Sequence, residues 1–133
     1  MDFSTIDLAA NADRGADCHI EHPITGEPLF TDESKPVIIR VLGQDSREFR
    51  SAISQLSEKA GKGKASLEKA EANAVALLTR LVVKWEGIIW EGAPLACTTE
   101  NVRMFLTKFP PIRRQIDEFV AERANFLQRG GKK

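Results

Sequence analysis

Side chains that commonly carry catalysis or covalent crosslinks are scarce in this sequence. It contains no tyrosine, two histidines and two cysteines among 133 residues. It also lacks a Gly-x-Ser-x-Gly nucleophile elbow, a phosphate-binding P-loop and a dinucleotide fingerprint, and neither histidine lies in a recognisable nucleophile arrangement. The cysteines, Cys18 and Cys97, are far apart, so a disulfide framework is not expected in a cytosolic chain. We therefore expect a binding protein, not an enzyme, and no cofactor.

Long apolar runs and a basic leader are also absent. No run approaches the roughly 20 apolar residues that cross a bilayer, and the acidic N-terminus does not resemble a secretory signal. A content of 42% hydrophobic and 29% charged residues is typical of one soluble domain. We expect a cytoplasmic protein with no membrane partner. Residues 1–16 are predicted to form a flexible acidic arm or a short frayed helix, 17–129 the domain, and 130–133 a charged tail.

Charge is balanced overall but unevenly distributed. The formal net charge is zero, yet residues 1–34 hold eight acids against one base, giving −7, so the remainder carries +7. One interpretation is charge balance within a single molecule. The other is contact between the acidic front of one subunit and the basic body of the next, which would build a ring or a spiral.

Lysines cluster in the run K-A-G-K-G-K-A at 59–65, a mobile connection or a helix break. Lys59, Lys62, Lys64 and the basic C-terminus are the only features that favour nucleic-acid binding. Neighbouring aromatic residues are absent, so we interpret the run as a solvated loop and expect no nucleic-acid partner.

The segment after the arm predicts a small antiparallel sheet. Two short extended runs flank Thr25-Gly26-Glu27, where Gly26 can supply the positive φ of a tight hairpin turn. The run P-V-I-I-R-V-L at 36–42 is rich in β-branched residues and stops at Gly43, as expected for a third strand.

Helical spacing follows. Asp45 and Glu48 form a capping box before a helix with apolar positions at 49, 52, 53 and 56. The longest helix is predicted to begin at the N-cap candidate Ser66 and to end near Glu86-Gly87. Its apolar positions are Leu67, Ala70, Ala74, Leu77, Leu78, Leu81 and Trp85.

Two further helices are predicted in the C-terminal third. After an irregular loop pinned by Trp90, Thr98 or Thr99 caps a helix with Val102, Phe105, Leu106 and Phe109 on one face. Pro110-Pro111 ends it, and Pro111 suits the first position of a last helix. The apolar stripe of that helix is Ile112, Ile116, Phe119, Val120, Phe126 and Leu127. The expected fold class is α+β, predominantly helical, with about four helices and a small N-terminal β-hairpin or three-stranded antiparallel sheet.

A metal site can be considered at Cys18, His19 and His22, with Cys97 as a fourth ligand. If residues 18–22 form a strand, alternation places Cys18 and His22 on one face and His19 on the other. The sequence therefore predicts no metal.

Apolar residues near turns and helix ends are the candidates for partner binding. Trp85 is expected in the core, whereas Trp90 either closes the core or stands partly exposed as an anchor. The candidates, any of which is alternatively a core residue, are Ile88, Ile89, Trp90, Met104 and Phe109.

The chain resembles the tail assembly chaperones of long, non-contractile-tailed bacteriophages. The resemblance runs from about Ala16 to Phe126 and rests on the order of four segments, since no single motif is diagnostic. They are H-P-I-T-G-E-P-L, I-R-V-L-G-Q-D-S-R-E-F-R, V-V-K-W-E-G-I-I-W-E-G-A-P-L-A-C-T-T-E-N-V and F-P-P-I-R-R-Q-I-D-E-F-V.

The resemblance implies a non-enzymatic protein of the host cytoplasm that acts in virion morphogenesis. Such proteins coat the tape measure protein, help recruit tail tube subunits and are absent from the mature virion. A longer frameshifted form is common in the family, and Gly130-Gly131-Lys132-Lys133 is compatible with one, because these codons can spell a run of G followed by A. The alternative is a small structural connector or completion protein that is retained in the virion.

Overall fold

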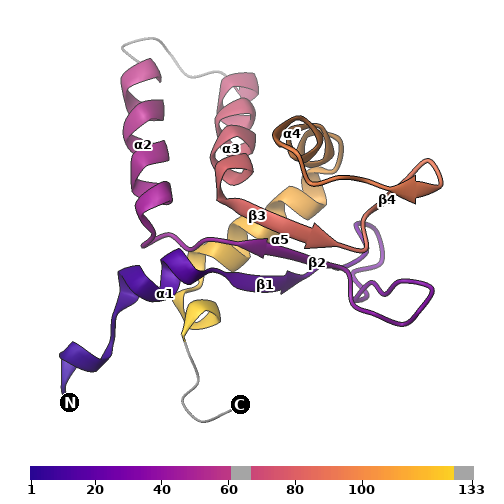
Figure 1. Ribbon diagram of the computed structural model, residues 1–133. Helices are drawn as coiled ribbons and strands as arrows, with labels where there is room; N and C mark the ends of the chain where they lie inside the picture. The colour runs from indigo at the N-terminus through magenta and orange to yellow at the C-terminus, as the bar shows by residue number, and fades with distance from the viewer. Residues whose placement is uncertain (61–66, 128–133) are drawn as a thin grey trace.

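The computed structural model describes residues 1–60 and 67–127 and has an α+β fold in which helices predominate (Figure 1). In these ranges, five α-helices accompany a three-stranded antiparallel sheet and a two-stranded hairpin, which confirms the predicted class. The helices are α1 Leu8–Arg14, α2 Arg47–Ala60, α3 Leu67–Leu81, α4 Thr99–Lys108 and α5 Pro110–Ala121, with 3-10 turns at Phe3–Thr5 (η1) and Arg123–Phe126 (η2). The strands are β1 Ala16–His19, β2 Ile38–Val41, β3 Val82–Glu86, β4 Ile89–Trp90 and β5 Ala93–Pro94.

The three-stranded sheet has the order β1-β2-β3, with both pairs antiparallel. Cys18 lies opposite Ile39, which lies opposite Trp85, and all three side chains are buried. Because side chains alternate between the faces of a sheet, the next row points the other way. There Asp17 and Arg40 form an ion pair of 2.9 Å, with the Asp17 side chain 53% exposed. One face of the sheet therefore builds the core and the other is polar.

The predicted strand at 36–42 is confirmed as β2, but the second run of the predicted hairpin, after Gly26, is not a strand in the described structure. The extended run after Gly26 makes only isolated bridges, between Glu21 and Pro28 and between Phe30 and Pro36. Proline has no N–H to donate to a ladder, so neither bridge is extended into a strand. The third position in the sheet is taken by β3, far along the chain.

The predicted continuation of the longest helix to Trp85 is wrong. Helix α3 ends at Leu81, and β3 begins at the next residue. The carbonyl oxygen of Leu81 accepts a hydrogen bond of 3.0 Å from the N–H of Leu42, at the end of β2. The β-branched pair Val82 and Val83 favours the extended conformation that follows. Trp85 is buried as expected, but from a strand.

Helix α2 begins one residue later than the predicted capping box implies. The N-cap is Ser46, whose Oγ accepts a hydrogen bond of 3.1 Å from the N–H of Phe49. Asp45 is therefore not the cap. Glu48 does not complete a capping box either, because its carboxylate forms an ion pair of 2.7 Å with Arg80 of α3.

Helices α2 and α3 lie side by side and rise from one end of the sheet (Figure 1). The Arg80 guanidinium also donates hydrogen bonds to Gln55 and Ser51 of α2, at 2.8 and 3.2 Å. The predicted apolar stripe of α3 is buried only towards its end, since Leu67 is 76% exposed and Ala70 is exposed. Residues 61–66 and 128–133, and with them Lys62, Lys64, Ser66 and the charged tail, lie outside the described ranges.

Residues predicted as an arm or a frayed helix contain α1, which is docked on the domain. A side-chain oxygen of Asp7 accepts a hydrogen bond of 2.9 Å from the N–H of Ala10 and caps the helix. Ala12 is buried, and its carbonyl oxygen accepts a hydrogen bond of 3.0 Å from the N–H of Gly43.

The C-terminal third follows its local signals until α5 ends. Thr98 caps α4, and its Oγ1 accepts a hydrogen bond of 3.1 Å from the N–H of Asn101. Pro110, and not Pro111 as predicted, takes the first position of α5, because Phe109 both ends α4 and precedes α5; Pro111 takes the second. The predicted last helix is interrupted at Glu122, and η2 follows, so Phe126 is buried while Leu127 is 47% exposed.

The core lies between the apolar face of the sheet and α3, α4 and α5. Figure 1 shows α5 passing behind the sheet. The largest fully buried apolar side chains are Ile20, Ile39, Leu78, Leu81, Leu106, Ile116 and Val41. None of the described helices is both long and apolar enough to cross a membrane.

Candidate functional site: a groove between α3, α4 and α5

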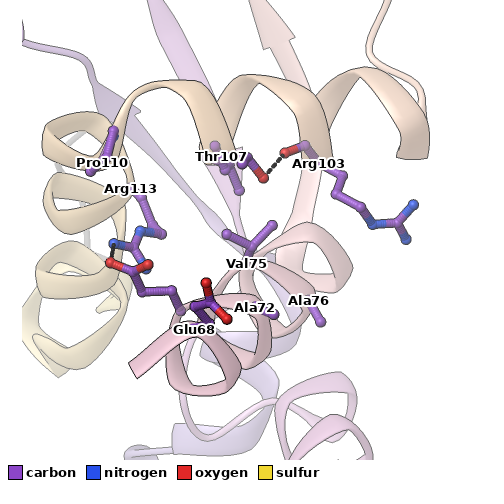
Figure 2. Close-up of a pocket in the computed structure, with 10 residues that line it drawn as sticks. Glu68, Ala72, Val75, Ala76, Arg103, Thr107, Pro110 and Arg113 are labelled. Atoms are coloured by element: carbon purple, nitrogen blue, oxygen red, sulfur yellow. Dashed lines mark hydrogen bonds and ion pairs between the residues drawn. The ribbon is translucent and has the colours of Figure 1, made fainter. Parts of the chain in front are cut away.

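A groove of about 330 Å³ lies where α3 faces α4 and the start of α5 (Figure 2). We call it the α3–α4 groove. Its α3 side uses positions that share one helix face, because they are three or four residues apart. The lining residues are Glu68, Glu71, Ala72, Val75, Ala76, Arg103, Leu106, Thr107, Pro110 and Arg113.

The floor of the groove is apolar, and its depth comes from short side chains. Val75 is 7% exposed and Leu106 is 1% exposed, so both close the bottom against the core. Ala72 is exposed and Ala76 is half-buried, and their methyl groups leave open the space that a longer side chain would fill.

Charged residues mark the two ends of the groove. At one end the carboxylate of Glu71 lies 4.0 Å from the guanidinium of Arg113, with side chains 55% and 18% exposed. Glu68 lies beside this pair, and Figure 2 shows Arg103 at the other end, directed away from Arg113. Among the described side chains of residues 1–57 and 67–127, neither Glu68 nor Arg103 forms an ion pair within 4.0 Å. Each end therefore offers one charge to a bound partner.

The predicted partner-binding residues do not form one surface. Ile88 is buried, Ile89 is 57% exposed, and Trp90, Met104 and Phe109 are half-buried. The structure brings together Trp90 and Phe109, whose ring centroids are 6.2 Å apart at an interplanar angle of 82°. Trp90 therefore packs partly on the end of α4 and keeps part of its ring exposed.

An aromatic row connects this pair with the core. Phe109 lies 5.1 Å from Phe105, which lies 5.5 Å from Trp85 between ring centroids. The Nε1–H of Trp85 donates a hydrogen bond of 2.7 Å to the carbonyl oxygen of Leu95. The row fixes α4 against β3 and so helps to set the position of one wall of the α3–α4 groove.

A second, wider cleft of about 560 Å³ lies beside the β4–β5 hairpin. Ile88, Ile89 and Phe30 line it, and Phe30 is 57% exposed. The segment 31–36 supplies a mostly charged opposite side, with Asp32, Glu33 and Lys35. The cleft combines a buried apolar side chain, Ile88, with the exposed ones of Ile89 and Phe30.

The cysteines and histidines do not converge. Burial, with a smaller contribution from Glu21, raises the pKa of the Cys18 thiol to about 11. The Nε2 of His19 lies 2.8 Å from the carbonyl oxygen of Leu29, and Cys97 is exposed. In the part of the chain that the structure describes, no three His, Cys, Asp or Glu side chains are placed to hold a metal ion.

Sequence reasoning missed the α3–α4 groove. One signal was available, because Glu68, Ala72, Val75 and Ala76 recur at helical spacing on a face of α3 other than its leucine stripe. Two alanines four residues apart indicate a depression on a helix surface, but the sequence does not show which helix packs opposite it. Comparisons with family models, with curated proteins and with solved structures find no match to this chain.

Proposed function

We propose that this protein is a tail assembly chaperone that binds helical segments of a phage tape measure protein and keeps them soluble. The observation that carries the proposal is the α3–α4 groove, which has an apolar floor and polar ends. Grooves between two helices are a common binding place for the apolar face of a third helix. The resemblance of the sequence to the phage chaperones supplies the identity of the partner.

The proposed role is assembly in the host cytoplasm, without catalysis. The protein holds the tape measure protein, helps to recruit subunits of the tail tube, and leaves before the particle matures. The cleft beside the β4–β5 hairpin is a second apolar surface, separate from the groove, and it suits this additional contact.

Self-association into a ring or spiral is part of the proposal. It would use N-terminal acids that form no ion pair within the described part of their own molecule. Within the molecule, Asp17 pairs with Arg40 and Asp13 approaches Arg47 to 3.6 Å, so two of the N-terminal acids already have basic neighbours. The other N-terminal acids form no ion pair within the described ranges and remain for contacts between subunits. Sedimentation at low and high salt tests this, because screening weakens such contacts; a monomer at low salt and high concentration contradicts it.

Co-expression with the tape measure protein tests the proposed function. We expect the tape measure protein to stay soluble and to co-purify with this chain. Insoluble tape measure protein, with this chain left free, contradicts the proposal. Mass spectrometry of mature particles then distinguishes the chaperone from a virion connector, since only the connector is retained.

A further inference from the structure

We propose that the α3–α4 groove holds about two turns of a partner helix with a fixed orientation of charge. The partner has apolar residues at i, i+3 or i+4, and i+7, a basic residue at the Glu68 end and an acidic residue at the Arg103 end. This inference rests on the proposed function, because it specifies which segments of the tape measure protein are bound.

The length of the occupant follows from the length of the groove. On α3 the lining residues run from Glu68 to Ala76, which is about 12 Å at the rise of an α-helix. Two turns of a helix present three apolar side chains over that distance, at positions i, i+3 or i+4, and i+7. The apolar floor at Val75 and Leu106 is the surface that they contact.

The orientation of the occupant follows from the charges. Glu71 is adjacent to the positive charge of Arg113, so the acid left for a partner at that end is Glu68. Arg103 provides an exposed positive charge at the opposite end, beside Ala76. A partner helix with the complementary order of charges makes a favourable charge interaction at each end of the groove. The reverse order places like charges together.

The first test fills the groove. Ala72→Leu puts a longer side chain over the apolar floor, while alanine and leucine have similar helix propensities. The matched control is Ala70→Leu, because Ala70 is also an exposed alanine of α3 and does not line the groove. With full-length tape measure protein as the probe, we expect Ala72→Leu to weaken binding at least about tenfold, about 1.4 kcal/mol, and Ala70→Leu to leave it unchanged.

The second test reverses the charges. The double variant Glu68→Lys with Arg103→Glu keeps the net charge and inverts its order along the groove. We expect it to bind the tape measure protein at least about fivefold more weakly, a size within reach of partly exposed charge pairs. The control is Lys84→Glu with Glu27→Lys, a charge exchange between two exposed residues that line neither the groove nor the cleft, and it should leave binding unchanged.

Crosslinking identifies the occupant itself. A photoreactive phenylalanine in place of Thr107, an exposed residue that lines the groove from α4, should capture in the purified complex tape measure segments that have the apolar spacing and the order of charges given above. Capture of a second copy of this chain, or of segments without that pattern, overturns the inference. So does undiminished binding by Ala72→Leu. If the unaltered chain does not hold the tape measure protein, the proposed function itself fails.

Discussion

The carboxylate of Asp45 accepts two hydrogen bonds from the guanidinium of Arg123, at 2.6 and 3.0 Å. This pair joins the residue before the α2 cap to η2, near the end of the described chain. The hydrogen bonds from Arg123, together with the charges of Arg123 and Arg50, hold the pKa of Asp45 below its usual value.

Asp45→Asn should lower stability in a pH-dependent way. A carboxyl whose pKa is lower in the folded state stabilises the fold above its unfolded pKa of about 3.9, and this contribution is lost as pH falls through the folded pKa. The difference in Tm between the variant and the unaltered chain should therefore be largest near pH 7 and should shrink below about pH 4. Thermal unfolding followed by circular dichroism measures it. Asp32→Asn, an exposed aspartate without an ion pair within the described ranges, is the control; an equal effect of both variants at all pH values contradicts the prediction.

Gln115→Ala should lower the free energy of unfolding by about 1–2 kcal/mol. The Gln115 side-chain amide accepts a hydrogen bond of 2.8 Å from the N–H of Glu21 and donates one of 2.9 Å to its carbonyl oxygen. Its removal leaves that backbone without these partners and loosens α5 from the chain after β1. Urea unfolding gives the free energy, and Arg114→Ala, an exposed neighbour on α5, should change it by less than about 0.5 kcal/mol.

Gly87→Ala should cost more stability than Gly92→Ala. Both glycines have positive φ, +86° and +85°, so each substitution carries a similar backbone strain. A Cβ on Gly87 would lie 2.9 Å from Thr31 Cγ2, whereas a Cβ on Gly92 would meet nothing within 4 Å. We expect Gly87→Ala to lose at least about 1 kcal/mol more, measured as a difference between two urea-unfolding curves. Equal losses would show that the contact with Thr31 relaxes without cost.

The two thiols should react with a disulfide reagent at very different rates. Cys18 is buried, and burial raises its pKa to about 11, so almost none of it is thiolate near pH 8. Cys97 is exposed, although partial burial also raises its pKa. At pH 8 the folded chain should therefore consume about one equivalent of the reagent quickly, at Cys97. The second equivalent, at Cys18, should react only in denaturant. Cys97→Ala should abolish the fast phase; a fast phase that survives this change contradicts the assignment.

Much of the helical part of the fold was readable because its signals are local. The Thr98 cap and the prolines that open α5 each act within a few residues. The strand β3 was not readable in this way. Leu78, Leu81 and Trp85 continue a helical spacing, and only pairing with the distant strand β2 selects the extended conformation.

The candidate site was less predictable than the fold. Apolar residues near turns were chosen, and the structure brings together only Trp90 and Phe109 in a direct ring contact. The α3–α4 groove depends on contacts between helices that are separated in the chain, such as Glu71 with Arg113. The residues that create the groove are alanines. They are hard to recognise in a sequence, because they act by leaving space and not by making contacts.

Helix α3 continues directly into β3, so the α3 wall of the groove is rigidly connected to the sheet. There is no linker at Leu81 that could act as a hinge, and the N–H of Leu42 holds the carbonyl oxygen at this junction. A bound helix therefore cannot widen the α3–α4 groove by moving α3 away from α4. We expect amide exchange in the last turn of α3 to be the same with and without the tape measure protein. The groove should then select among partner helices by their shape, because it does not change its own shape to fit them.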